Sequence, residues 1–571
     1  MKKLLPIFSL LLLFSLQAGA QSFEYSYKGS ILKYEAHHDS ATVTGFTSIA
    51  ADSLLEIPST VQDSTGASYR VISLGSSSFY NNQGIKEVIL PASLAFIENY
   101  VFNGCIHLTS IKLPEGLVSM GYCTFQNCAA LASIILPNSL KNVGGYSFYG
   151  TTIDKPLYNS HLFAFMPASY SGSYTIPDGI EKIGFGAFDN CAKLTEVYLP
   201  SSVTTLDDDA FFMCNALATV HLNEGLTSIG EYAFFMCNTL TTLELPTSVT
   251  SIGKWAFSRC TSLSSLKILG DLTYLGDGAF DGCTALTNPI YNTHTFAYMP
   301  TSFSGSYTVP DGITAIGGSA FKGCDSITSI TLPQGITTIG GSAFYNCGHL
   351  ASINLPSSVT QIGAAAFEGC SSLKIIVLPE GLTSIGDWNF YQCSSLDSVY
   401  IPQSITSLGY YAFQGCSKLR RVDLPDGITS LPQMAFADCI ALTSITLPAG
   451  ITSLGAQCFA NCMNLSEIHV LSSTPPTIEN KGHVFDNVDK FVCVVYVPEG
   501  SIPAYQEAYG WREFMDFMEV STGVEMNTND KVGEEVYNLD GTLSGFHKTG
   551  VKIVVTHYSD GTTKSRKVLY K

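Results

Sequence analysis

Cysteine is the residue with the widest chemistry in this 571-residue chain, and fourteen of its seventeen cysteines recur in one register. A repeated thiol can bind zinc, form disulfides or pack as a small buried apolar group. Nearly every step between these cysteines is 23 residues. The register contains Cys105, Cys128, Cys191, Cys214, Cys237, Cys260, Cys283, Cys324, Cys347, Cys370, Cys393, Cys416, Cys439 and Cys462.

The spacing favours buried thiols over a metal site or a disulfide scaffold. Metal sites bring pairs such as CxxC or HxxxH to one point, whereas one cysteine in each repeat gives a line of thiols. Stacked repeats would bring equivalent Cα atoms to about 5 Å, within disulfide range, but their side chains would point in parallel into the core. We therefore predict reduced, structural thiols. Cys123, Cys458 and Cys493 lie off the register, and the sequence leaves open whether they pair or stay free.

The outward positions of the predicted strands are the other place where chemistry could be assembled. His221, beside Glu196 and Glu244 on neighbouring strands, is the arrangement closest to a catalytic trio. No carboxylate pair, Ser–His–Asp grouping or phosphate-binding loop emerges from these rows. We therefore expect no catalytic residue, no cofactor and no metal, and interpret the rows as an extended binding surface. The candidate binding residues are Glu196, Tyr198, His221, Glu244, Tyr400, Arg421 and Asp423.

Three consecutive carboxylates, residues 207–209, could form a calcium ligand set. We interpret them as a solvated acidic loop.

A phenylalanine three residues before each cysteine follows the same period, in sixteen units from Phe79 to Phe459. A fixed period in the twenties is typical of a solenoid. Within a unit such as residues 111–131, alternating Leu and Ile predict a strand, a proline ends it, and a second short strand follows. One coil cannot bury its apolar edge alone, so we expect stacked coils that share their Leu, Ile and Phe rows and form a long parallel sheet.

Two matching insertions break the period, near residues 156–180 and 289–313. Both are rich in aromatic residues and end in Ser-Gly-Ser-Tyr-Thr, which is a turn followed by a strand. We predict that each insertion is a hairpin-like elaboration that returns to the solenoid.

Composition and charge limit the classes of function. Hydrophobic residues make up 46% of the chain and charged residues 13%, which predicts a folded core. The net charge of −18 argues against nucleic acid as a partner, because phosphate binding needs a dense basic surface. Residues 1–20 have two lysines, an apolar stretch and a small-residue cleavage site, as in a signal peptide. No later stretch is apolar for long enough to predict a membrane span.

The pattern LPxGITSIGxxAFxxC resembles the BspA-like leucine-rich repeats of bacterial surface proteins, over roughly residues 71–470. The resemblance implies a β-rich leucine-rich-repeat solenoid, with a β-rich N-terminal cap over residues 21–70 and a C-terminal cap over 471–520. A terminal coil must hide a face that no neighbour covers. We expect that face to be closed at the C-terminal end by Tyr505, Tyr509, Trp511 and Phe514.

Residues 521–571 have apolar alternations separated by the turn signals Asp540-Gly541 and Asp560-Gly561, which predict a small antiparallel β domain. Together with the motif Val-Tyr-Asn-Leu-Asp-Gly and a basic end, this segment resembles the C-terminal sorting domain of the type IX secretion system. The resemblance implies a β-sandwich-like domain, contact with that secretion machinery, and a secreted or outer-surface protein. Without that export step the protein would stay in the periplasm.

The expected function is inherited from the resemblance, because a fold does not specify a function. It implies a non-enzymatic adhesin whose solenoid binds a host matrix protein or another cell. One alternative is a carbohydrate-binding surface module, and the other is an envelope spacer without a dedicated ligand. For the carbohydrate module, the stacking platforms would be Tyr198, Tyr400, Tyr170 and Phe303.

Overall fold

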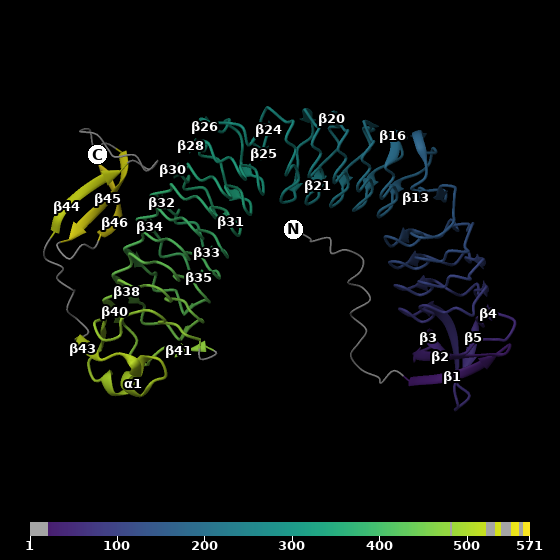
Figure 1. Ribbon diagram of the computed structural model, residues 1–571, viewed down its shortest axis with the longest axis horizontal. Helices are drawn as coiled ribbons and strands as arrows, with labels where there is room; N and C mark the ends of the chain where they lie inside the picture. The colour runs from purple at the N-terminus through teal and green to yellow at the C-terminus, as the bar shows by residue number, and fades with distance from the viewer. Residues whose placement is uncertain (1–20, 480–481, 521–530, 538–549, 559–562, 571) are drawn as a thin grey trace. The chain divides into compact units, whose positions relative to one another are not determined.

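The computed structural model describes residues 21–479 and 482–520 in full, and the backbone of 531–537, 550–558 and 563–570. The predicted signal peptide therefore lies outside the described residues. The chain divides into two compact units at the bond between Cys237 and Asn238. Nearly all regular structure in both units is β-strand (Figure 1). Among the described residues, no helix has the length and apolar character needed to cross a membrane.

Most coils of the first unit contribute two strands, which join two separate parallel ladders. The longer strands are β4 (Leu54–Glu56), β7 (Glu87–Ile89) and β9 (Ser110–Lys112), then β14 (Ser171–Thr175), β16 (Lys193–Tyr198) and β18 (Thr219–His221). The second ladder contains β6 (Ser68–Leu74), β8 (Phe96–Ile97), β10 (Ser119–Met120) and β11 (Asn142–Val143), then β13 (Leu162–Phe165), β15 (Lys182–Ile183), β17 (Thr205–Leu206) and β19 (Ser228–Ile229).

The second unit repeats this arrangement with the same parallel register. Its longer strands are β20 (Thr242–Leu245), β22 (Ser265–Ile268), β26 (Gly305–Thr308), β28 (Ile327–Thr331), β30 (Ser352–Asn354), β32 (Ile375–Val377), β34 (Ser398–Tyr400), β36 (Arg421–Asp423), β38 (Ser444–Leu447), β40 (Glu467–Val470), β42 (Val494–Pro498) and β43 (Asp516–Val520). Its shorter strands are β21 (Ser251–Ile252), β23 (Tyr274–Leu275), β25 (Thr295–Tyr298), β27 (Ala315–Ile316), β29 (Thr338–Ile339), β31 (Gln361–Ile362), β33 (Ser384–Ile385), β35 (Ser407–Leu408), β37 (Ser430–Leu431), β39 (Ser453–Leu454) and β41 (Thr477–Ile478).

The predicted β-solenoid is confirmed, with one difference in the sheets. Instead of one long parallel sheet, most coils pair through two ladders, and the ladder of the longer strands is broken into segments of two to five strands. The strands are short because the proline that ends the first strand and the turn that follows the second leave little backbone for pairing. Most of the coil is therefore turn, and its stability depends on side chains that stack from coil to coil.

The predicted phenylalanine row stacks from coil to coil in runs that are interrupted at the two insertions. In the second unit the centroid of the Phe344 ring lies 5.2 Å from those of Phe321 and Phe367, and all three side chains are fully buried. Offset stacking at roughly 4.5–7 Å is favourable for aromatic rings. The phenylalanine period thus sets how one coil packs on the next.

The predicted buried thiol row is confirmed, and the structure shows why cysteine suits this position. All seventeen cysteines are free and buried. The thiol of Cys393 donates a hydrogen bond to the backbone carbonyl of Phe367 at 3.1 Å, and Cys128 bonds Phe102 in the same way. Each such bond spans 26 residues and ties a coil to the preceding one. Cysteine is therefore both a small apolar group and the donor for a buried carbonyl.

These thiols should be unreactive in the native protein. Burial raises the pKa of Cys105 and Cys128 to about 12, so the reactive thiolate is scarce. With Ellman's reagent at pH 8, we expect essentially no reaction of the folded full chain and reaction of all seventeen thiols after unfolding in guanidinium. Mass spectrometry of the unreduced, unfolded chain is the control, and disulfides within the ladder would contradict this account of the core.

Both insertions begin with the predicted hairpin and then form a modified coil. In the first, β12 (Leu157–Tyr158) pairs antiparallel with β13. Strand β13 also pairs parallel with β15, and β14 pairs parallel with β16. The Phe163 ring stacks on Phe188 with centroids 4.8 Å apart, and the backbone carbonyl of Met166 accepts a hydrogen bond from the Cys191 thiol at 3.6 Å. The second insertion, with β24 (Ile290–Tyr291), has the same hairpin and ladder pairings.

The ends of the solenoid are built differently from the coils. Strands β1 (Gln21–Tyr27), β2 (Ser30–His37) and β3 (Ser40–Ser48) form an antiparallel ribbon that continues into β6, which also pairs with β5 (Thr60–Gln62). At the other end, near α1 (Ile502–Glu507) and η3 (Trp511–Glu513), Tyr505, Trp511 and Phe514 are buried. The expectation for Tyr509 is wrong, because it is 46% exposed with Arg512 over its ring.

The described backbone near the C-terminus forms one antiparallel sheet, made of β44 (Lys531–Tyr537), β45 (Gly550–Tyr558) and β46 (Thr563–Tyr570). The turn signals at residues 540–541 and 560–561 lie outside the described residues. A β-sandwich-like sorting domain over residues 521–571 stays a prediction.

Candidate functional site

Adjacent outward positions on β16 and β18 bring three of the predicted binding residues together. Inward-facing Val197 and Val220 alternate with outward-facing side chains on these strands. In the parallel register Tyr198 is the direct partner of His221, and Glu196 lies two residues earlier on the same face. We call Glu196, Tyr198 and His221 the β16–β18 cluster.

The β16–β18 cluster is internally bonded and exposed. The imidazole of His221 stacks on the Tyr198 ring with centroids 4.1 Å apart and planes 5° apart. His221 Nε2 lies 2.8 Å from Glu196 Oε1. Hydrogen bonds from His221 and Tyr198 hold the pKa of Glu196 below its usual range, and the bond to Glu196 raises the pKa of Tyr198. The three side chains hold one another in place while Tyr198 stays 39% exposed.

A histidine bonded to a carboxylate is half of a catalytic triad, in which the other ring nitrogen must contact a nucleophile. In the part of the chain that the structure describes, no hydroxyl or thiol bonds His221 in this way. Glu244 lies in the second unit, where Lys267 Nζ donates to its carboxylate at 3.3 Å. The arrangement offers a flat ring pair, a carboxylate and a hydroxyl for binding a ligand.

The remaining predicted residues lie on the outward face of the second unit, but each is engaged by a neighbour. The Tyr400 hydroxyl donates to Glu380 Oε1 at 2.7 Å, and burial together with this bond raises the pKa of Tyr400 to about 12. Arg421 Nε donates to Asp423 Oδ1 at 2.9 Å on the same strand. These residues form two separate bonded pairs, with no shared bond among them in the described structure.

A second histidine–tyrosine stack, which the repeat period did not predict, lies on β40 and β42. His469 stacks on Tyr496 with centroids 4.3 Å apart, and Glu467 Oε2 lies 3.1 Å from His469 Nε2. The three residue types match those of the β16–β18 cluster. Tyr496 was missed because it follows His469 by 27 residues, outside the 23-residue period, although the alternation in Val494–Pro498 marks a strand.

The three consecutive carboxylates are not a uniformly solvated loop. Asp207 forms an ion pair with Lys182, in which Lys182 Nζ lies 2.7 Å from Asp207 Oδ2. Asp208 is exposed. Burial, with the neighbouring charge of Asp189, raises the pKa of Asp209 to about 7. The prediction is therefore correct for Asp208 and wrong for the other two. Within the described residues, no three His, Cys, Asp or Glu side chains gather closely enough to hold a metal ion.

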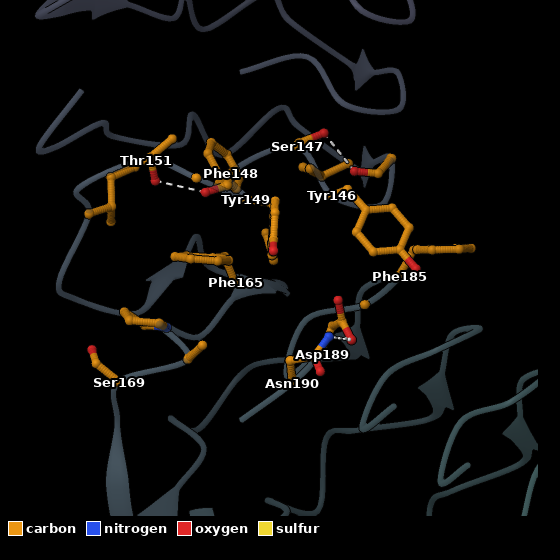
Figure 2. Close-up of a pocket in the computed structure, with 18 residues that line it drawn as sticks. Tyr146, Ser147, Phe148, Tyr149, Thr151, Phe165, Ser169, Phe185, Asp189 and Asn190 are labelled. Atoms are coloured by element: carbon orange, nitrogen blue, oxygen red, sulfur yellow. Dashed lines mark hydrogen bonds between the residues drawn. The ribbon is translucent and has the colours of Figure 1, made fainter. Parts of the chain in front are cut away.

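A pocket of about 280 Å³ opens where the first insertion leaves the regular coils (Figure 2). Its wall combines rings with polar groups, and Figure 2 shows Asp189 and Asn190 on the side opposite Phe148 and Tyr149. Tyr146 and Phe185 form one flank, with ring centroids 6.4 Å apart. The pocket could not be predicted from the sequence, because its walls come from segments about forty residues apart, residues 143–153 and 185–190 among them.

Comparisons with known proteins agree with the repeat pattern. A family model described as a BspA type leucine-rich repeat region matches residues 63–174, 161–287, 290–420 and 388–490. No curated protein matches the chain. A leucine-rich repeat protein from Bacteroides ovatus is 24% identical, with 80% of this chain and 94% of that chain covered and a TM-score of 0.29.

Two other solved structures are similar in the same limited way. A leucine rich cell surface protein from Faecalibacterium prausnitzii is 24% identical, with 75% of this chain and 95% of that chain covered and a TM-score of 0.33. The pneumococcal vaccine antigen PcpA is 16% identical, with 88% of this chain and 99% of that chain covered and a TM-score of 0.28.

Proposed function

This chain belongs to the BspA-type leucine-rich repeat family, and from this premise we propose that it is an exported surface protein that binds an extracellular protein without catalysing a reaction. The outward face of the longer strands is the binding surface. Adhesion to a host matrix protein or to another cell is the role that fits such a surface. The predicted signal peptide and the sorting-domain resemblance of residues 521–571 support export to the outer surface, with the periplasm as the alternative.

The observation that carries the proposal is the β16–β18 cluster. Interface energy concentrates in a few aromatic and charged side chains, with tyrosine among the most frequent. A side chain already held in one conformation loses little entropy when a partner binds. Stacking on His221 and bonding to Glu196 hold the exposed Tyr198 ring in this manner. The cluster is thus preorganised for a partner.

Replacing Tyr198 or His221 by alanine should weaken binding of the partner roughly tenfold, since loss of an interface hot spot commonly has an effect of this size. The measurement passes the purified full chain over immobilised matrix proteins and polysaccharides, and then titrates the ligand that is retained. Tyr80→Ala is the matched control, because Tyr80 is an exposed tyrosine, 50% accessible, in a turn away from the longer strands.

The pattern of results separates the alternatives. The affinity for a protein partner should depend on ionic strength, because the chain carries a net charge of −18 and salt screens interactions between charges. Saturable binding to one polysaccharide would favour the carbohydrate-binding module instead. For that module, Tyr170 and Phe303 are weak platforms, because each packs edge-on against a tyrosine at 5.4 Å. No retained ligand, and no effect of either variant, would support an envelope spacer.

Treatment of intact producing cells with a membrane-impermeant protease tests the location separately. Cleavage of the protein on intact cells is expected for an outer-surface protein. Protection on intact cells, with cleavage after the outer membrane is opened, would place the protein in the periplasm.

A further inference from the structure

We propose that the pocket at the first insertion binds a primary ammonium group, supplied by a lysine side chain of a partner protein, between the carboxylate of Asp189 and the rings of Tyr146 and Tyr149. This site lies apart from the outward face of the longer strands, so the inference goes beyond the proposed function. It rests on the composition of the pocket and on an internal comparison with the second insertion.

The pocket has the components that an alkylammonium group needs. Cations bind over the faces of aromatic rings, most strongly where water is excluded, and carboxylates accept their hydrogen bonds. The pocket is lined by five aromatic residues and by the Asp189 carboxylate (Figure 2). The aromatic residues are Tyr146, Phe148, Tyr149, Phe165 and Phe185. Its volume of about 280 Å³ leaves room for the ammonium and its methylene stem. The apolar rings would cover the stem, as they cover the stems of lysines elsewhere.

Asp189 has no cation partner in the described structure. Asn190 Nδ2 donates to its Oδ1 at 2.8 Å. Burial raises the pKa of Asp189 to about 6, which shows that its charge is poorly compensated. The groups that face it are Asn190, Asp209 and the hydroxyl of Tyr146, with the buried thiols of Cys191 and Cys214 behind. None of these is positively charged, so a bound cation would complement the site.

In the second insertion, a lysine of the chain itself provides an ammonium group next to a carboxylate. In the repeat register Lys322 follows Phe321 as Asp189 follows Phe188, and in the preceding coil Asp281 follows Phe280 as Tyr149 follows Phe148. Lys322 Nζ bonds Asp281 Oδ2 there and lies 5.8 Å from the centroid of the Tyr345 ring. The second insertion thus pairs a lysine ammonium with a carboxylate and a ring, whereas the first has the carboxylate and the rings alone.

The test titrates Nα-acetyl-lysine amide into the full chain at pH 7.5 by isothermal calorimetry or ligand-observed NMR. Nα-acetyl-norleucine amide, which has the apolar stem without the ammonium, is the neutral comparison. We expect saturable binding of the lysine compound, binding at least about tenfold weaker for the norleucine compound, and a loss of about tenfold or more in Asp189→Asn. Asp178→Asn is the matched control, because this exposed carboxylate of the same insertion lies outside the pocket.

A double variant keeps the proposal testable if Asp189→Asn alters the fold. Asp189→Lys with Tyr149→Asp introduces the residues of the second insertion, so the new lysine should occupy the pocket and abolish binding while the thermal unfolding midpoint is retained. Binding to wild type should also weaken from pH 7.5 to pH 5, because the carboxylate is protonated below about pH 6. Equal binding of the two amides, or full binding by Asp189→Asn, would overturn the proposal, as would no binding of the lysine compound.

Discussion

Replacement of Phe344 by alanine is expected to destabilise the second unit by about 3–5 kcal/mol, the range typical of a buried phenylalanine truncated to alanine. The ring is fully buried between Phe321 and Phe367, so its removal opens a cavity and interrupts two stacking contacts at once. The free energy of unfolding of a solenoid is approximately the sum of the stabilities of its single coils and of the interfaces between neighbouring coils. A gap in the ring stack therefore weakens both interfaces of the coil that contains it.

Urea unfolding monitored by circular dichroism measures this effect. Phe491→Ala is the matched control, because Phe491 is 76% exposed and its loss should change stability by no more than about 0.5 kcal/mol. Hydrogen exchange locates the damage, and protection should fall most in the coils on either side of Phe344. Equal midpoints for the two variants would show that the ring stack contributes little to the core.

Gly363→Ala is expected to destabilise the same unit by about 2–3 kcal/mol, although it adds only a methyl group. Gly363 follows the short strand β31, in the Ile-Gly step that recurs along the solenoid. A β-carbon there would lie 2.4 Å from the backbone nitrogen of Gly341 in the preceding coil. Backbone cannot move aside as a flexible side chain can, so the two coils would have to separate and their hydrogen bonds would lengthen.

Gly335→Ala is the control, and we expect this substitution to stabilise the unit instead of destabilising it. A β-carbon at Gly335 would lie 3.7 Å from its nearest neighbour, the carbonyl oxygen of Ile313, which is ordinary contact. Removing a glycine from a compatible site stabilises by about 0.4–1 kcal/mol, through the lower entropy of the unfolded chain. Thermal and urea midpoints of the two variants provide the comparison. If both variants were equally stable, close backbone approach would not explain the recurring glycine.

The repeated features of the fold could be predicted from the amino-acid sequence. The constant spacing of Phe and Cys, the alternation of Leu and Ile, and the proline after each strand identify the coil, its buried positions and its parallel stacking. These predictions succeed because each coil contacts mainly its neighbours, so a local pattern repeated many times determines the packing. The sequence also identified Glu196, Tyr198 and His221, since equivalent positions on successive coils become neighbours in a parallel ladder.

Only the tertiary structure decided which atoms meet where the repetition is broken or where coils touch closely. It shows that Cys393 bonds a carbonyl 26 residues earlier and that Gly363 lies against the backbone of the preceding coil. It also brings His469 to Tyr496 across an irregular spacing, and places Asp189 at a pocket beside the first insertion. These contacts depend on the rise and the turn path of each coil, which local residue patterns do not encode. The solenoid therefore follows from the period of the sequence, and the candidate sites follow from the packing of particular coils.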